Sequence, residues 1–220
     1  MTEEDSNKIW MQMYPLFSTP VIRDRIEYNI DMEFVKNLSY KRYRDNSGFG
    51  SETQKLLLLP EFSEIKKQIE FRLNYYLFEI LKFKQGTIKH ASSWINYHKP
   101  GDASAIHNHT NSCYSGILYL KTAENCGKLW FSYPSCIPTY VSSTITPVLG
   151  EPNIYNSYNF AFNPIDGELF LFPSHLSHFT GINESNEDRY CIAFNYFLDG
   201  YLGGSTNELN ITVNEYGTPN

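Results

Sequence analysis

The most regular pattern of apolar and polar positions in the chain lies between residues 60 and 83. In "PEFSEIKKQIEFRLNYYLFEILKF", apolar residues recur every three or four positions, as they do along one face of an amphipathic helix. Pro60 suits the first turn of a helix, because its missing N–H would have no partner there, and Gly86 ends the pattern. A shorter stretch with similar spacing, residues 33–43, predicts another helix before it. The apolar stripe of the long helix consists of Phe62, Ile65, Ile69, Leu73, Leu77 and Ile80.

From residue 87 onwards the pattern becomes that of strands and turns. Short runs rich in Ile, Tyr, Phe and Trp are separated by Gly, Pro, Asn and Asp. Helices followed by strands are typical of a mainly β (α+β) protein, in which a β-sandwich or barrel is supported on one side by the long helix. We interpret four aromatic residues as core: Trp94, Trp130, Phe170 and Phe172. The strands are predicted at residues 87–98, 104–109, 114–120, 128–133, 167–173 and 189–198.

A segment rich in Pro, Ser, Thr and Asn interrupts the strands at residues 134–166. It is too long for a simple turn, and two interpretations stay open: a functional loop or a pair of irregular strands. Together with residues 44–55, it is a candidate for covering the mouth of the barrel and selecting a substrate. The tail from residue 203 onwards is predicted to be coil.

A chain of 220 residues can bury one sizeable core, so we expect a single domain. Residues 1–86 are expected to supply an extension and supporting helices, residues 87–200 the β core, and residues 201–220 a tail. No apolar run approaches the length of a membrane span, and "MTEEDSNKIW" does not resemble a signal peptide. We therefore expect a cytoplasmic protein that does not bind membranes.

Charge and cysteine content narrow the function further. The net charge is -6 and there is no dense Lys/Arg block, so nucleic-acid binding is not indicated. The four cysteines are unequally spaced and include no CxxC pair, which predicts free thiols. The sequence leaves open whether the protein forms a homodimer.

Two histidines in "SAIHNH" are the first candidates for chemistry. His107 and His109 are two residues apart, so both side chains point to the same face of a predicted strand and both can reach one metal ion. Imidazole is a ligand for iron, zinc, copper or nickel, although an HxH pair alone also fits incidental surface histidines. His175 and His178 follow another predicted strand, and Arg189 stands eleven residues after His178. Three histidines from two strands would leave adjacent positions open on an octahedral metal.

These residues carry a resemblance to a known family. The stretches "SWINYHKPGDASAIHNH", "SGILYL" and "GELFLFPSHLSHFTGINESNEDRYCIAFNYF" are similar to the metal-binding strands of cupin-like double-stranded β-helix (jelly roll) proteins. With the added arginine, the pattern resembles that of 2-oxoglutarate- and Fe(II)-dependent oxygenases of the prolyl-hydroxylase type, in particular a bacterial and phage group. The likeness covers most of residues 14–200 and is densest over 93–198.

The resemblance implies a fold, an activity and its cofactors. The fold would be a double-stranded β-helix with the N-terminal helices packed on one sheet. The enzyme would use Fe(II), 2-oxoglutarate and O2 to hydroxylate an unidentified substrate, with release of succinate and CO2. His107, His109 and His178 would ligate iron, and Arg189 would bind the distal carboxylate of 2-oxoglutarate. The other residues implied near the cosubstrate are Tyr97, Tyr119 and, on the same face of the strand as the arginine, Asn195.

Several alternatives stay open. Most of the superfamily has Asp or Glu where this chain has His109, so Asp102 is a second candidate for the missing carboxylate, and His175 is a second candidate for the distal histidine. Arg189 without this context would be interpreted as half of a surface ion pair with Glu187 or the neighbouring aspartate. The alternative functions are a cupin-like metal-dependent dioxygenase or isomerase that does not use 2-oxoglutarate, and a non-catalytic β-barrel binding protein.

Overall fold

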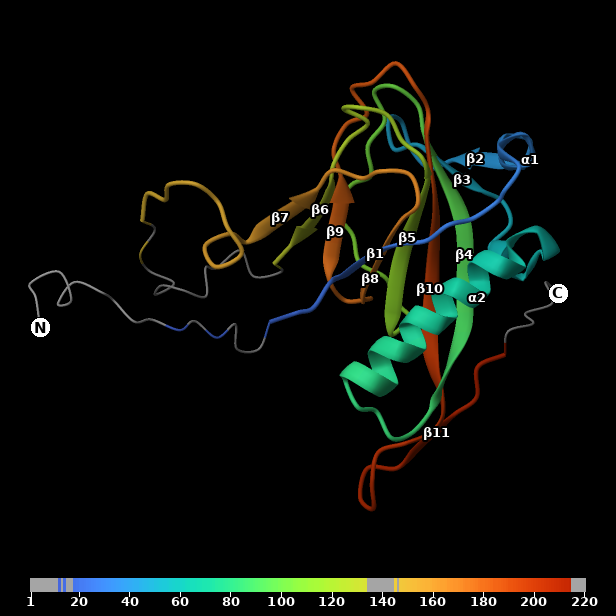
Figure 1. Ribbon diagram of the computed structural model, residues 1–220, viewed down its shortest axis with the longest axis vertical. Coiled ribbons are helices and arrows are strands. Elements are labelled where there is room, and N and C mark those ends of the chain that lie inside the picture. Colours follow the sequence, from blue (N-terminus) through green and yellow to red (C-terminus); the bar gives the residue numbers. More distant parts are fainter. Residues whose placement is uncertain (1–11, 13, 15–17, 134–144, 146, 215–220) are drawn as a thin grey trace, which may run out of the picture.

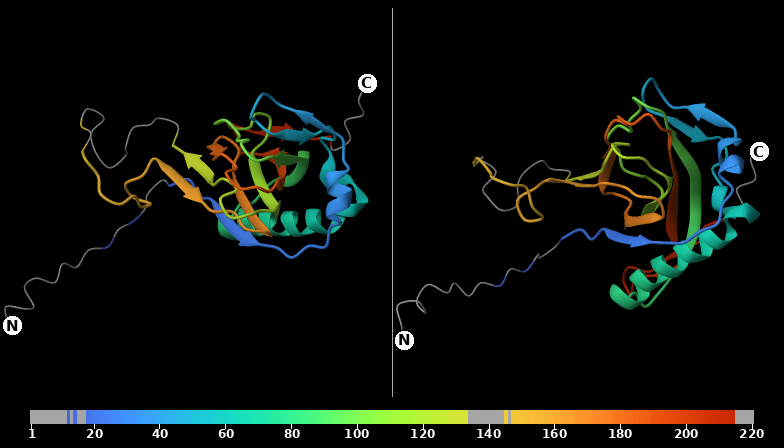
Figure 2. Two further views of the ribbon diagram at one scale, coloured as in Figure 1. Left: turned by 90° about the horizontal axis from the view of Figure 1, so that it is seen from above. Right: turned by 45° about the horizontal axis from the view of Figure 1, so that its top comes forward.

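A computed structural model describes residues 12, 14, 18–133, 145 and 147–214 of the chain. The strands form two antiparallel sheets that face each other, with one long helix on the outer side of the larger sheet (Figures 1 and 2). The strand order is β1-β8-β5-β10-β4-β3-β2 in the larger sheet, where β11 also pairs with β10, and β7-β6-β9 in the smaller sheet. The strands are β1 (Ile22–Arg25), β2 (Tyr40–Arg42), β3 (Phe49–Ser51), β4 (Thr87–His98), β5 (Tyr114–Lys121), β6 (Leu129–Ser132), β7 (Asn159–Phe162), β8 (Glu168–Pro173), β9 (Ser177–Thr180), β10 (Arg189–Leu202) and β11 (Leu209–Ile211). The expected mainly β (α+β) class is confirmed.

The long helix lies where the apolar stripe predicted it. Its α-helical part is α2 (Ser63–Asn74), which follows 3-10 turns at Leu56–Leu58 and Pro60–Phe62 and continues as a π-helical turn at Tyr75–Ile80. The predicted stripe is wrong at its last position, because Ile80 is 58% exposed. A π-helical turn winds more slowly than an α-helix, so it rotates the residues that follow out of the phase of the stripe.

The first predicted helix, residues 33–43, is largely wrong. Only α1 (Met32–Lys36) is helical, with the Asp31 side chain as its N-cap, and the chain then enters β2. Tyr40 pairs with Ser51 on β3, and its hydroxyl donates to the carbonyl of Val35. The helical spacing of this short stretch is thus overridden by pairing with a strand that lies later in the sequence.

The core has two parts, one on each face of the larger sheet. Between α2 and the sheet lie Ile69 and Leu73 of the helix and Leu118 of β5, all fully buried. On the opposite face, Ile117 and Tyr119 of β5 are buried inside the barrel. Because successive residues of a strand point to opposite faces, this central strand is apolar on both. Its inner face forms part of the cavity described below.

Most of the predicted strands are present, but the one at residues 104–109 is not. Within that stretch only His107 makes a β-bridge, an isolated antiparallel bridge to His178. One more backbone bond joins the segment to β9, from the N–H of Thr180 to the carbonyl of Ser104. The N–H of His109 instead donates to the carbonyl of Ser174, and the N–H of Ser104 donates to a side chain. The segment therefore follows β9 without forming a regular strand.

Short strands and the ends of the barrel account for the remaining differences. β1, β2, β3 and β9 were not predicted, and β10 continues to Leu202, past the expected end at residue 198. The tail expected to be coil pairs β11 with β10, while residues 215–220 lie outside the described residues. In the 134–166 segment, residues 159–162 form β7, paired with β6, whereas residues 134–144 and 146, including Cys136, lie outside the described part.

The predicted core aromatics divide into two pairs. Phe170 and Phe172 are fully buried, as expected. Trp94 and Trp130 are only half-buried, so the core interpretation is wrong for them. Trp94 lines the cavity instead, and Trp130 stacks on Phe179 with 5.8 Å between the ring centres. None of the helices in the described parts of the chain has the length and apolar content that a membrane-spanning helix needs.

Candidate metal centre

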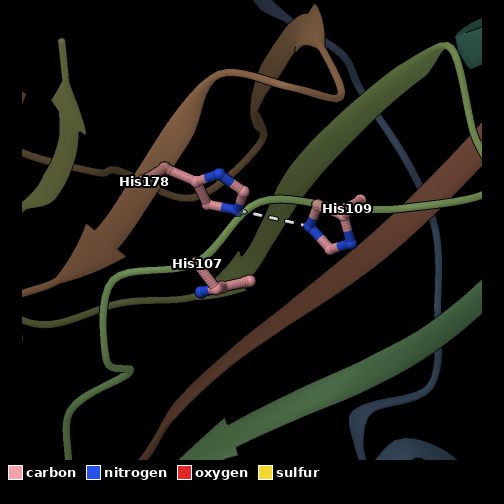
Figure 3. Close-up of side chains that lie close together, drawn as sticks. All are labelled: His107, His109 and His178. Atoms are coloured by element: carbon pink, nitrogen blue, oxygen red, sulfur yellow. Dashed lines mark hydrogen bonds between the residues drawn. The ribbon is translucent and has the colours of Figure 1, made fainter. Parts of the chain in front are cut away.

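Three imidazoles meet at the opening between the two sheets. His178 comes from β9, while His107 and His109 come from the segment that runs beside it. One ring nitrogen of each lies within 4.8 Å of those of the other two, and the Nε2 atoms of His109 and His178 are 3.3 Å apart (Figure 3). The structure thus brings together the three histidines chosen from the sequence, although the first two do not lie on a regular strand.

Hydrogen bonds fix which nitrogen of two of these rings carries a proton. Nδ1 of His107 is 2.8 Å from the carbonyl oxygen of Ala105, and Nδ1 of His178 is 3.0 Å from that of Leu176. A carbonyl oxygen only accepts, so each Nδ1 must donate, which leaves the lone pair on Nε2. Backbone carbonyls orient metal-binding histidines in this way.

The rings of His109 and His178 are neutral at physiological pH. Burial, together with the nearby His107, lowers the pKa of His109 to about 4 and that of His178 to about 3. A metal ligand must be the neutral imidazole, so no proton has to be displaced before a cation binds. The converging lone pairs suit a cation bound by imidazole, such as Fe(II).

The two alternative ligands do not join the cluster. Asp102 is buried, but its carboxylate forms an ion pair with Arg42 at 2.8 Å and accepts from the N–H of Lys99. His175 is exposed and points elsewhere. Among the described residues the candidate cation site therefore contains imidazoles and no carboxylate.

Arg189 lies deep inside the barrel and is 1% exposed. Its Nη1 donates to the carbonyls of Cys126 at 2.7 Å and Gly127 at 3.0 Å, and its Nη2 donates to the hydroxyl of Thr180 at 3.1 Å. Its Nε has no hydrogen-bond partner in the described part of the chain. The surface ion pair considered for this arginine is wrong, because Glu187 pairs with Lys121.

The guanidinium is a buried cation that no described carboxylate balances. Every carboxylate found in an ion pair within the described ranges has another partner. An unpaired buried charge is costly, so the position favours an anionic ligand. Gly127 makes room for this arrangement: at its φ of +90°, an added Cβ would be 2.3 Å from the carbonyl oxygen of Gly181 and 3.0 Å from Nη1 of Arg189.

One cavity contains the imidazoles, and Thr180 at its other end accepts a hydrogen bond from the arginine. Near that end, Thr180 already accepts from the N–H of Ser104 and from Arg189, so its own hydroxyl hydrogen is free to donate. Tyr119 Oη and His98 Nδ1 are buried there without a partner among the described residues. Such unsatisfied buried polar atoms are rare, and they fit a polar ligand. The cavity is lined by Trp94, Asn96, His98, Ser104, His107, His109, Ile117, Tyr119, His178, Phe179, Thr180, Cys191 and Ala193.

Tyr97 does not reach this cavity, so the structure contradicts its expected place near the cosubstrate. Its ring stacks on Tyr190, with 4.7 Å between the ring centres, and on Phe49 at 5.1 Å. The side chains of β4 alternate between the two faces, and it is Asn96 and His98 that point inward. The residues of β4 that face the cavity are thus the immediate neighbours of Tyr97 in the sequence.

Tyr119 and Asn195 differ in their positions. Tyr119 lines the cavity, as expected. Asn195 is buried in a separate polar cluster, where it accepts from the Ser115 hydroxyl at 2.7 Å and donates to the Ser92 hydroxyl at 2.9 Å. With both ends of its carboxamide engaged, it is absent from the cavity lining, and this placement contradicts its expected contact with the cosubstrate.

Four polar cavity residues were missed in the sequence: Asn96, His98, Ser104 and Thr180. Side chains alternate between the two faces of a strand. If Trp94 is taken to face inward, this alternation predicts that Asn96 and His98 face inward as well. Ser104 and Thr180 gave no such signal, because they face each other through a contact between segments far apart in the chain.

Comparisons with known proteins identify a family that part of the chain resembles. The sequence profile of a family described as "Putative 2OG-Fe(II) oxygenase" matches residues 92–195, which include all three histidines and Arg189. No curated protein has a sequence that matches this chain.

Solved structures show the fold. A Pseudomonas putida prolyl-4-hydroxylase is similar with a TM-score of 0.52 and 11% identity, over 84% of this chain and 96% of its own. The non-heme alpha ketoglutarate dependent carbocyclase SnoK from nogalamycin biosynthesis gives 0.53 and 9%, over 83% of this chain and 81% of its own. A 2OG-Fe(II) oxygenase family oxidoreductase from Burkholderia pseudomallei gives 0.50 and 11%, over 74% and 73%.

These likenesses confirm the double-stranded β-helix, with its helix packed on the outer face of one sheet. Oxygenases of this family use Fe(II), 2-oxoglutarate and O2, so the expected cofactors are those of the family, and a histidine cluster able to hold the metal is present. The interpretation as a non-catalytic barrel is set aside. The sequence profile that matches residues 92–195 and the fold are both those of 2-oxoglutarate- and Fe(II)-dependent oxygenases.

Proposed function

We propose that this protein is a hydroxylase in which His107, His109 and His178 hold Fe(II) and Arg189 binds the distal carboxylate of 2-oxoglutarate. The observation that carries the proposal is that one cavity contains the three imidazoles and has in its wall Thr180, the hydrogen-bond partner of a buried guanidinium that no described carboxylate balances. A dicarboxylic keto acid has a chelating end for a metal and an anionic end for an arginine, so it matches both features.

The inner end of the cavity supplies further donors for the carboxylate. Thr180 has a free hydroxyl hydrogen, and burial raises the pKa of Tyr119 far above its ordinary value, so its hydroxyl stays protonated. Burial and Arg189 lower the pKa of His98 to about 3, so this ring is neutral. Its Nδ1 carries a proton whenever the Ser104 hydroxyl donates to Nε2, 2.9 Å away. These groups would orient the carboxylate together with the guanidinium.

When bound, iron and the keto acid supply the oxidation of a C–H bond by O2: one oxygen atom becomes the new hydroxyl and the other enters succinate as CO2 leaves. The chain's own part is to bind and orient. The three imidazoles would leave adjacent metal positions free, and the apolar side chains of Ile117 and Ala193 would exclude water from the reacting end.

The substrate that is hydroxylated is not identified by the residues of the cavity. For the compartment we propose the cytoplasm, since Cys113, Cys126 and Cys191 are free thiols, as is usual in a reducing environment.

Anaerobic titration tests the proposal. Fe(II) followed by 2-oxoglutarate should produce the visible charge-transfer band of a metal-bound keto acid, and His178→Ala should abolish it. His175→Ala is the matched control, because this exposed histidine lies three residues away and outside the cluster, and it should keep the band. With 2-oxobutanoate, which lacks the distal carboxylate, the band should need a much higher concentration.

A second candidate is favoured by the missing carboxylate ligand: a cupin-like dioxygenase or isomerase that does not use 2-oxoglutarate. In that case Fe(II) would bind, but 2-oxoglutarate would neither produce a band nor protect the protein against thermal unfolding. This outcome would overturn the proposal.

A further inference from the structure

Asn96 occupies the middle of the cavity wall. It lies on β4 between two other lining residues, Trp94 and His98. The Trp94 ring is 5.9 Å from that of His109, measured between ring centres, and His98 is the register partner of Arg189 on β10. A ligand that extends from the histidines to the arginine therefore passes Asn96.

Two donors fix the orientation of the Asn96 side chain. Nε1 of Trp94 donates to Oδ1 at 2.9 Å, and the hydroxyl of Tyr43 donates to the same oxygen at 3.0 Å. An indole N–H can only donate, so a flipped carboxamide would place the NH2 group of Asn96 against the N–H of Trp94, with no acceptor between them. The oxygen is thus engaged by two donors, and Nδ2, which has no hydrogen bond among the described residues, is the polar group left for a ligand in the cavity.

The position of the Tyr43 hydroxyl depends on Gly50. A Cβ on Gly50 would be 2.1 Å from Tyr43 Oη and 2.5 Å from its Cζ, so the tyrosine occupies the space of the absent side chain. Although Tyr43 as a whole is 52% exposed, its hydroxyl end lies against the backbone of Gly50. Burial raises the pKa of Tyr43 to about 12, so this hydroxyl remains a donor at neutral pH.

We propose that Tyr43 and Trp94 are positioning residues, which together hold the Asn96 carboxamide with its NH2 group toward the cosubstrate. Asn96 then donates to an oxygen of the bound keto acid, between the metal and Arg189. The inference rests on the proposed function, because it assumes a keto acid in this cavity. It adds a group outside the barrel strands, at the turn after β2, to the residues that set cosubstrate affinity.

Asn96→Asp separates this role from a structural one. The variant keeps an oxygen for both Trp94 and Tyr43, so the wall should stay intact and the melting temperature should not fall. Its second oxygen replaces the NH2 group and would face the carboxylates of the keto acid. We expect the Kd for 2-oxoglutarate, measured by the anaerobic charge-transfer band, to rise by at least about tenfold. An unchanged Kd in a folded variant would overturn the inference.

Tyr43→Phe tests the positioning residue itself. The Asn96 carboxamide would be held by Trp94 alone, and the Kd for 2-oxoglutarate should rise about threefold, while the affinity for Fe(II) alone stays the same. Tyr40→Phe is the matched control, since it removes a tyrosine hydrogen bond of 2.7 Å on the other side of the same sheet. It should lower the melting temperature without changing the Kd. Equal Kd effects in the two variants would contradict the inference.

Failure of the proposed function gives a different result. If the wild-type protein binds Fe(II) but 2-oxoglutarate produces no band, the proposed function fails, and the inference fails with it. If the wild type gives the band and Asn96→Asp titrates as the wild type does, only the inference is overturned.

Discussion

Replacing Arg189 by methionine removes the guanidinium and keeps most of the apolar length of the side chain, so it separates charge from packing. In the wild type the group is 1% exposed and makes three hydrogen bonds, none to a carboxylate. A carboxylate bound there would form a desolvated, charge-assisted pair, and removing one partner of such a pair costs about 3–5 kcal/mol. The affinity for 2-oxoglutarate should therefore fall by roughly 10²- to 10³-fold.

Thermal unfolding under anaerobic conditions measures this loss. With metal present, 2-oxoglutarate at a hundred times its Kd should stabilise the wild type by about 2.7 kcal/mol. For a chain of this size, that raises the melting temperature by roughly 5–10 °C. The same concentration should leave the melting temperature of Arg189→Met almost unchanged, and the variant should no longer distinguish 2-oxoglutarate from 2-oxobutanoate.

The ligand-free proteins provide the internal control. Without keto acid, the variant loses its bonds to the carbonyls of Cys126 and Gly127, but it also loses an unbalanced buried charge, and these effects oppose each other. We therefore expect the two ligand-free proteins to differ less than the two bound ones. A folded, metal-binding Arg189→Met that gains the full wild-type increment from 2-oxoglutarate would refute the assignment of the arginine.

Three further outcomes are expected. Calorimetric titration should show that His178→Ala loses Fe(II) binding, whereas the exposed His175 can be replaced by alanine without effect. Burial holds the pKa of His90 at about 4, below its ordinary 6.5, so the unfolded state takes up a proton that the folded state does not. The contribution of His90 to the free energy of unfolding should thus fall by up to about 3 kcal/mol between about pH 6.5 and 4, and His90→Gln should remove this part of the pH dependence in melting curves. Leu73→Ala, at a fully buried position of α2, should lower the free energy of unfolding in urea by about 2–5 kcal/mol, whereas Phe71→Ala, where the side chain is 70% exposed, should change it by less than about 0.5 kcal/mol.

The parts of the fold that local sequence could predict are those with their own periodic signal. The stripe of α2 and the apolar β5 follow from helical and strand spacing, because each element is buried against a neighbour over its whole length. β2 and β3 have three residues each, too few for any period. β2 pairs with β3, and β3 pairs with β4, which lies more than forty residues beyond β2 in the sequence.

The same distinction between local patterns and contacts between distant segments applies to the candidate site. The histidines and Arg189 belong to a spacing pattern that a family shares, so their proximity was predictable. Tyr97 was chosen in place of Asn96 and His98, since the face of a strand buried on both sides cannot be assigned from apolar residues alone. The contact between Tyr43 and Asn96 spans 53 positions and depends on the absent side chain of Gly50, so no local pattern predicts it.

Charge links the two ends of the cavity. Three neutral imidazoles leave the full charge of a divalent metal uncompensated, where an Asp or Glu ligand would remove one unit. Arg189 adds another positive charge at the far end, and the described carboxylate nearest in sequence to the histidines, Asp102, is already paired with Arg42. A neutral ligand would leave both positive groups in a medium of low dielectric constant, whereas a dianion that reaches from one to the other offsets both. The missing carboxylate ligand and the unpaired arginine thus point to the same ligand, one with negative charge at each end.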